Sequence, residues 1–180
     1  MNEVALAIRV LSSLVFVSAA LGKFRHPLAW QGVVANYRLM PQWAVPVFAL
    51  MLPPAEAATA VALLIEPARL PELIAAVLLL AFACAMSINL LRGRRHIDCG
   101  CFQSTLKQSL RWALVLRNAS LVLLLAFAAS TPEAALSMQA TVEGVIVGTN
   151  LFVLLQAMNM IWSVVPAWQG RSAVSAGAQQ

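Results

Sequence analysis

The amino-acid sequence predicts an all-α protein, a multi-pass transmembrane helical bundle of about five spans. The chain of 180 residues is 61% hydrophobic and only 11% charged, whereas about 25% of the residues of a soluble domain are charged. The apolar residues also occur in runs of about 20, the length that a helix needs to cross a bilayer. A polar Cys-Gly-Cys loop lies between the third and fourth runs and contains two of the three cysteines.

The five expected spans share a high apolar content and are separated by polar or proline-containing segments. A retained first span is favoured over a cleaved signal peptide, because the run is long and lacks clustered positive charge before it. We expect a single integral membrane helical domain over residues 1–169 and a disordered C-terminal tail over 170–180. The spans are expected at 4–22, 46–65, 73–91, 112–130 and 144–165.

The segment between the first two spans is rich in aromatic and basic residues. Because Trp and Tyr favour the membrane–water interface, residues 28–40 are expected to form a short helix on the membrane surface. His26 precedes Pro27 and is expected to be a loop residue rather than a ligand. Arg9, near the start of the first span, is expected to extend its side chain to the lipid head groups.

Glu56 is a candidate functional residue because ionisable groups inside a span are rare and costly. It follows Pro53 and Pro54, where the lost backbone donor is expected to kink or break the helix. The dipole of the following helical turn would favour a negative charge at this position. The alternative is a carboxylate at the interface. If Glu56 is buried, Arg9 or Arg117 is a guessed partner.

Other polar or small residues within the spans are expected to pack rather than to react. Cys84 is interpreted as a small buried hydrophobe, and Asn89 as the donor or acceptor of an interhelical hydrogen bond. Gly144 and Gly148 form a pattern typical of close helix packing. A stripe on one face of the last span is also expected to hold helices together: Thr149, Gln156, Asn159 and Ser163.

Cys99 and Cys101 are the main candidates for chemistry. A disulfide needs Cα atoms about 4.4–6.8 Å apart, and residues two apart meet this only if the backbone bends, which Gly100 permits. So small a ring is expected to be strained, and strained disulfides are easily reduced. Basic residues at 94–96 favour the reactive thiolate, whereas Asp98 opposes it. The pair therefore suits reversible thiol–disulfide exchange.

Other interpretations of the two cysteines remain open: unpaired inert thiols, a structural bridge, or a soft-metal site. Zinc prefers four ligands, and the loop offers neither a further cysteine nor a second nearby histidine. Copper(I) stays possible because thiolates suit it. We expect no metal and no cofactor.

The net charge of +5 is interpreted as a signal of membrane orientation, because Lys and Arg collect in cytoplasmic loops. No basic stripe with interleaved aromatic residues indicates binding to nucleic acid. The positive-inside rule places the two cysteines at the cytoplasmic face, together with most of the basic residues: Lys23, Arg25, Arg38, Arg92, Arg94, Arg95, Lys107, Arg111 and Arg171.

Several motifs resemble those of the DoxX-like membrane proteins, and together they resemble the MauE family of methylamine utilization proteins. The resemblance covers roughly the first four spans, and its most specific part is the block that contains Cys99 and Cys101. Gln103 departs from the glycine that often follows this block in the family. The motifs are GKFRHP at 22–27, YRLMP at 37–41, LPPAE at 52–56, INLLRGRRHIDCGCF at 88–102 and LRN at 116–118.

The resemblance implies a multi-pass accessory protein of the bacterial inner (cell) membrane rather than a metabolic enzyme. Its implied role is processing, transport or maturation of the methylamine dehydrogenase β (small) subunit, which carries several disulfides and a tryptophan-derived quinone. The implied partners are that subunit and MauD, a thioredoxin-like protein. Cys99 and Cys101 would then exchange disulfides with the partner.

Two other classes of function remain open. A small-solute transporter would use Glu56 and the polar stripe of the last span, although the sequence has no internal repeat. A membrane scaffold would need neither cysteine. The cytoplasmic placement of the pair also conflicts with maturation in the periplasm. Either thiol equivalents are relayed across the bilayer, or a re-entrant segment at Pro53 and Pro54 reverses the later loops.

Overall fold

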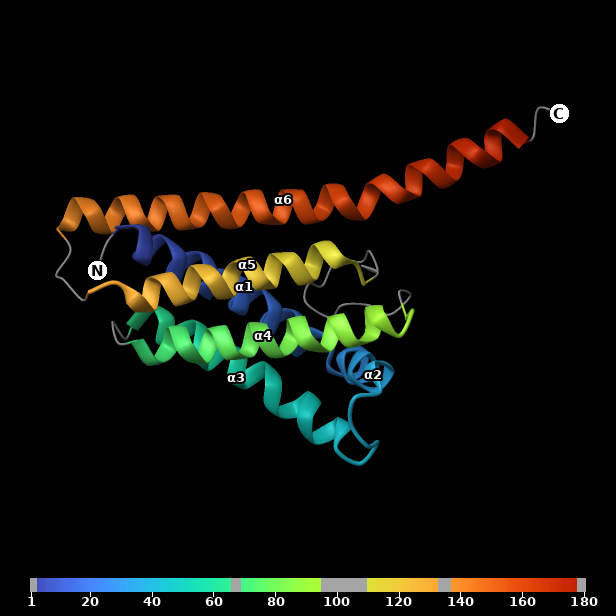
Figure 1. Cartoon of the computed structure of the whole chain (residues 1–180), viewed down its shortest axis with the longest axis horizontal. Coiled ribbons are helices and arrows are strands. Elements are labelled where there is room, and N and C mark those ends of the chain that lie inside the picture. Colours follow the sequence, from blue (N-terminus) through green and yellow to red (C-terminus); the bar gives the residue numbers. More distant parts are fainter. Residues whose placement is uncertain (1–2, 66–68, 95–109, 133–136, 178–180) are drawn as a thin grey trace.

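The computed structural model describes residues 3–65, 69–94, 110–132 and 137–177, with side chains described as far as residue 161. This part of the chain is all-α and forms six helices (Figure 1). They are α1 (Glu3–Arg25), α2 (Pro27–Tyr37), α3 (Val45–Ile65), α4 (Arg69–Leu91), α5 (Trp112–Ser130) and α6 (Met138–Gly177).

Five of these helices are long and apolar enough to cross a membrane: α1, α3, α4, α5 and residues Met138–Ile161 of α6. The predictions of an all-α fold and of about five long apolar spans are therefore confirmed. The remaining helix, α2 (Pro27–Tyr37), overlaps the segment 28–40 expected to form a short surface helix. The Cys-Gly-Cys loop falls in 95–109, outside the described residues.

Helix α1 is the centre of the bundle. It packs against α3, α5 and α6, whereas α4 packs mainly against α5. Among the five candidate spans, α1 has the largest buried share. The core cluster around it takes apolar side chains from α1, α3, α4 and α5, including Phe16, Leu63, Leu79, Leu121 and Leu125.

The helices alternate in direction and give the bundle two different ends (Figure 1). The end of α1, all of α2, the end of α4 and the start of α5 lie together at one end. We call this the basic end, because described basic residues gather in its helix termini and connections: Lys23, Arg25, Arg38, Arg92, Arg94 and Arg111. Arg69 and Arg9 belong to the opposite end.

The sequence predicts a kink or a break at Pro53 and Pro54. The break is wrong, because α3 continues through both prolines, and the kink stays a prediction. Pro53 has no N–H to donate to the carbonyl of Ala49, four residues earlier. The indole Nε1 of Trp30 donates to this carbonyl instead, at 3.1 Å. Replacement donors of this kind allow proline inside membrane helices. The same hydrogen bond attaches α2 to α3.

Helix α6 extends from Met138 to Gly177. The expectation of a disordered tail over 170–180 stays a prediction. Residues 178–180 lie outside the description, and the prediction of a single domain over 1–169 stays a prediction.

Gly144 and Gly148 allow α6 to approach α1 closely. A Cβ atom at Gly148 would lie 2.6 Å from the backbone oxygen of Ala7 and 2.8 Å from Cβ of Val10. At Gly144 the nearest atom would be Cδ2 of Leu6, at 2.9 Å, in a flexible side chain, and the nearest backbone atom would be the oxygen of Glu3, at 3.1 Å, farther away than the backbone oxygen at Gly148. The close packing expected from this glycine pair is therefore present.

We expect Gly148→Ala to destabilise the protein more than Gly144→Ala. Overpacking of this kind costs about 1–3 kcal/mol, and Gly148 should fall in the upper part of that range because the obstacle is backbone. Unfolding of the purified protein in detergent measures both changes. Gly32→Ala is the matched control, since no atom lies within 4 Å of a Cβ there. Equal losses at Gly144 and Gly148 would contradict this packing.

Candidate functional site: buried ion pairs beside an apolar pocket

Lys23 and Glu56 form an ion pair inside the bundle. Nζ of Lys23 donates to both carboxylate oxygens of Glu56, at 2.5 and 2.6 Å. Lys23 is 3% exposed and Glu56 is fully buried. A buried charge persists only when a partner compensates for its lost hydration. The pair therefore joins the last turns of α1 to the middle of α3.

Two aromatic rings complete the surroundings of the Lys23 ammonium. Nζ lies 4.7 Å from the ring centroid of Trp30 and 5.3 Å from that of Phe82. Cations over aromatic faces are attracted by the ring quadrupole, most strongly where water is excluded. Lys23 thus contacts side chains from α2, α3 and α4, and it lies where these three helices meet at the basic end.

Arg9 and Glu72 form a second ion pair, near the opposite end of α1. Nε of Arg9 is 3.5 Å from Oε1 of Glu72 and donates to the backbone oxygen of Leu63 at 2.8 Å. Both side chains are buried, at 2% and 3% exposure. The expectation that Arg9 extends to the head groups is wrong, because its charge is compensated inside the bundle. Arg9 connects α1 to both α3 and α4.

The guessed partners of Glu56 are also wrong. Arg9 pairs with Glu72, and Arg117 donates from Nε and Nη2 to Oδ1 of Asn118, at 3.3 and 3.1 Å. Sequence reasoning missed Lys23 because it was assigned to the loop after the first span. A signal was present, since 14 residues separate Lys23 from Arg9. This is close to four helical turns and places both on one face of α1.

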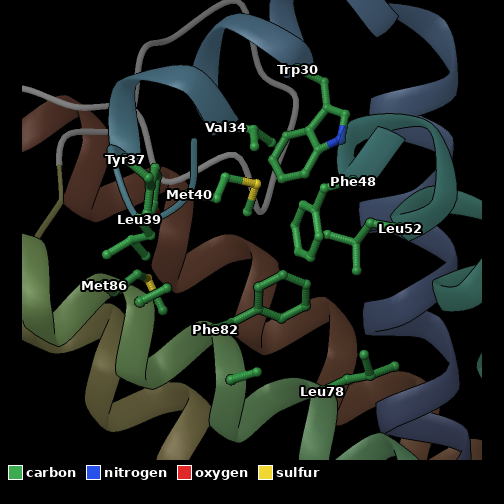
Figure 2. A pocket seen from close by; sticks show the side chains of 12 residues that line it. Trp30, Val34, Tyr37, Leu39, Met40, Phe48, Leu52, Leu78, Phe82 and Met86 are labelled. Carbon is green, nitrogen blue, oxygen red and sulfur yellow. The ribbon is translucent and has the colours of Figure 1, made fainter. Parts of the chain in front are cut away.

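An apolar pocket lies beside the Lys23–Glu56 pair, between α2, α3 and α4 (Figure 2). Its volume is about 190 Å³, and nearly all of its lining is apolar. Trp30, Phe48 and Phe82 surround the open space, and the sulfur-containing side chains of Met40 and Met86 also face it. No sequence pattern indicated this pocket, because its residues come from three separate segments.

Cys99 and Cys101 lie outside the described residues, so their pairing and surroundings stay predictions. The helices on either side of them are described. Leu90 of α4 packs in one buried cluster with Leu110 and Leu114, and Tyr37 of α2 packs against this cluster. The described residues on either side of 95–109 therefore lie together at the basic end, next to α2.

Three expectations for other polar residues need correction. Cys84 is exposed on α4, so it faces the lipid side of the bundle instead of packing in the core. Nδ2 of Asn89 donates to the oxygen of Ala85 in its own helix, at 3.1 Å. Thr149 is exposed and donates to Val145 of its own helix, so it does not join α6 to a neighbouring helix. His26 precedes α2 as an exposed loop residue, as expected.

Within the described ranges, no group of three or more His, Cys, Asp or Glu side chains could hold a metal ion. The described site instead consists of charges that compensate each other inside a bundle of apolar helices. These features define a multi-span helical membrane protein whose central helix carries two buried ion pairs.

Comparison with known proteins identifies the family. The family described as "Methylamine utilisation protein MauE" matches residues 1–131. MauE of Paracoccus denitrificans is 49% identical over 130 residues, covering 71% of this chain and 70% of the relative. MauE of Methylorubrum extorquens is 46% identical over 117 residues, with coverages of 64% and 63%. MauE of Paracoccus versutus is 40% identical over 158 residues, with coverages of 86% and 85%.

The chain belongs to the MauE family of bacterial methylamine utilization proteins. The match ends just after α5, so α6 from residue 138 onward lies outside the family profile. No solved structure matches the chain.

Proposed function

We propose that this protein serves the processing, transport or maturation of the methylamine dehydrogenase β subunit in the inner membrane. In this proposal Cys99 and Cys101 exchange disulfides with MauD, the thioredoxin-like partner, during oxidation of the subunit. Membership of a family named for methylamine utilization supports the pathway. The Cys-Gly-Cys sequence supports the chemistry, because Gly100 permits the bend that a disulfide between such close residues requires.

One structural observation carries the proposal furthest. Leu90, near the end of α4, and Leu110, just before α5, are buried in the same cluster. The described residues before and after the segment that contains both cysteines are therefore close together in a packed helix pair. In this proposal the partner approaches the protein at that end of the bundle.

The orientation in the membrane is part of the proposal and rests on the distribution of charge. The positive-inside rule places the basic end at the cytoplasmic face, whereas the β subunit matures in the periplasm. The unbroken course of α3 favours a relay of thiol equivalents across the bilayer over a re-entrant segment.

Serine variants test the exchange of disulfides. Attack of a thiolate on a disulfide passes through a mixed disulfide, and loss of the resolving thiol prolongs this intermediate. Of Cys99→Ser and Cys101→Ser, one should accumulate a covalent complex with MauD, visible on non-reducing gels of acid-trapped membranes. Both should lower the yield of oxidised β subunit at least tenfold, with its transcript unchanged.

Cys84→Ser is the matched control, because Cys84 is exposed on the lipid side of α4 and lies outside the proposed pair. It should support normal β-subunit yield. Normal yield in both loop variants as well would contradict the exchange of disulfides and favour a scaffold or a transporter. A copper site would instead lose metal without any covalent complex.

A further inference from the structure

The apolar pocket between α2, α3 and α4 is elongated along the helices. Its lining residues on α4 are spaced by three, one, three and one, which places them on one face of that helix. They are Leu78, Ala81, Phe82, Ala85 and Met86. At a rise of 1.5 Å per residue, this stripe is about 12 Å long. The pocket therefore follows the direction of a candidate membrane span, which is also the direction of the acyl chains in a bilayer.

The size and lining of the pocket suit part of a hydrocarbon chain. Its volume is about 190 Å³, and an apolar cavity of about 150 Å³ holds one benzene molecule. Nearly all of the lining is apolar, so a polar group placed there would lose its hydration without a replacement hydrogen bond. A hydrocarbon chain has no hydration of this kind to lose.

The pocket is accessible from the surrounding lipid. Phe48 and Leu39, two of its lining residues, remain 42% and 38% exposed. Helices α3 and α4 diverge toward the basic end (Figure 1). Figure 2 shows Tyr37 and Leu39 together at one side of the pocket, and Leu78 far from them at the other. The pocket therefore starts at the basic end and extends along α4 toward the middle of the bundle.

Arg38 is held beside this end of the pocket. It lies between two lining residues, Tyr37 and Leu39, and caps the C-terminus of α2. Its φ of 47° is in the left-handed region, which glycine adopts freely and other residues adopt at a cost. Arg38 is exposed, and neither ion pair of the described residues includes it. An arginine where the backbone favours glycine indicates a use for its charge.

The surroundings of Arg38 are positively charged. Arg25 and Arg92 are also exposed at the basic end. The exposed acidic residues of the described ranges, Glu3 and Glu143, lie near the starts of α1 and α6, at the opposite end (Figure 1). Basic pockets between membrane helices bind the head groups of anionic lipids. The position of Arg38 therefore favours a ligand with a negative head and an apolar tail.

We infer that the pocket and Arg38 together bind one anionic phospholipid of the surrounding bilayer. One acyl chain occupies the pocket, and the head-group phosphate pairs with the Arg38 guanidinium, whose planar fork of N–H groups matches phosphate oxygens. The chain covers the rings of Trp30 and Phe82, which contact the Lys23 ammonium, so it keeps water away from the buried Lys23–Glu56 pair. This inference does not depend on the proposed exchange of disulfides.

Lipids with brominated acyl chains test the site, because bromine quenches the fluorescence of a tryptophan that it contacts. The full-length protein is placed in phosphatidylcholine vesicles with increasing fractions of brominated phosphatidylglycerol or brominated phosphatidylcholine. Comparison with Trp30→Phe isolates the signal of Trp30, which lines the pocket and is only 9% exposed. Half-maximal quenching should need roughly fivefold less phosphatidylglycerol than phosphatidylcholine, the preference expected from one arginine near an anionic lipid. Equal requirements would overturn the inference.

Variants test the two parts of the site separately. Ala85→Leu fills the pocket and should remove most of the Trp30 quenching by either lipid. Arg38→Gln should keep the quenching but lose the preference for phosphatidylglycerol. Ala126→Leu on α5 and Arg69→Gln at the opposite end, both at exposed sites, are the matched controls and should behave like the unmodified protein. Full quenching in Ala85→Leu, or the same loss of preference in Arg69→Gln as in Arg38→Gln, would overturn the inference.

Arg38→Gly distinguishes lipid binding from a role in the fold. Glycine adopts the positive φ freely, so Arg38→Gly should be at least as stable as Arg38→Gln in phosphatidylcholine vesicles. It should nevertheless lose the preference for phosphatidylglycerol, because it lacks the guanidinium. A preference that persists in Arg38→Gly would overturn the pairing of Arg38 with the phosphate.

Discussion

Glu56→Leu should lower the free energy of unfolding by about 3–5 kcal/mol, because it leaves the Lys23 ammonium buried without a counter-charge. Both carboxylate oxygens of Glu56 accept from that ammonium, so no nearby acceptor replaces them fully. Glu56→Gln keeps the shape and one acceptor, and we expect it to accumulate in the membrane while impairing β-subunit maturation. Denaturant unfolding in detergent and the yield of β subunit measure the two effects.

The double variant Lys23→Met with Glu56→Leu tests whether the stability lost in Glu56→Leu comes from the unpaired charge of Lys23. Replacement of a whole buried pair by apolar residues is often neutral or stabilising, so most of the lost stability should return. Arg25→Met, which removes an exposed charge two residues away, is the control and should change stability by less than about 0.5 kcal/mol. A loss in the double variant equal to the sum of the single losses would contradict the pairing of Lys23 with Glu56.

The second large effect is expected at Arg9. Arg9→Met should also cost about 3–5 kcal/mol, because it leaves the Glu72 carboxylate buried and unpaired. It also removes the donor to the backbone oxygen of Leu63. The residue four positions after Leu63 is Pro67, which has no N–H to give to that oxygen. Unfolding in detergent measures the loss.

Glu72→Gln provides the comparison for this pair. It keeps an oxygen near Nε of Arg9 and leaves the hydrogen bond from Arg9 to Leu63 intact, so it should cost less than Arg9→Met. Arg69→Met, near the same end of the bundle, tests for a general effect of charge removal. If Arg9→Met unfolds no more easily than Arg69→Met, Arg9 does not stabilise the bundle.

Much of the fold could be predicted from the sequence because the bilayer imposes simple rules. A span needs about 20 apolar residues, and runs of this length separate clearly from segments such as 23–45 and 91–111. The glycine spacing at 144 and 148 also indicated a real contact, since only glycine allows α6 to approach the backbone of Ala7 so closely.

The site could be predicted only in part. Glu56 was identified because a carboxylate is costly inside a span, but its partner depends on how α1 packs against α3, which no local pattern records. The pairing of Arg9 with Glu72 could not be predicted either, because it depends on how α1 packs against α4. The expectation of a break at Pro53 failed for a related reason: a donor from another helix, Trp30, satisfies the carbonyl that the proline leaves free.

Cys84 shows that burial in a membrane protein follows rules different from those in water. A small apolar thiol is usually buried in a soluble core, but lipid is as apolar as the protein interior and leaves little reason for a thiol to face inward. The spacing of apolar residues in α4 did not distinguish the side that packs in the bundle from the exposed side. Its exposed position follows from the packing of the other face of α4 against α5.

The redox state of Cys99 and Cys101 tests the central claim most directly. Membranes from growing cells are alkylated before and after dithiothreitol, and mass spectrometry of the peptide that contains both residues counts the blocked thiols. The proposed exchange predicts a reversible disulfide, with both thiols protected before reduction and both alkylated after it. Cys84 should react equally under both conditions. Two loop thiols that are always free, with neither trapping a partner, would contradict the claim.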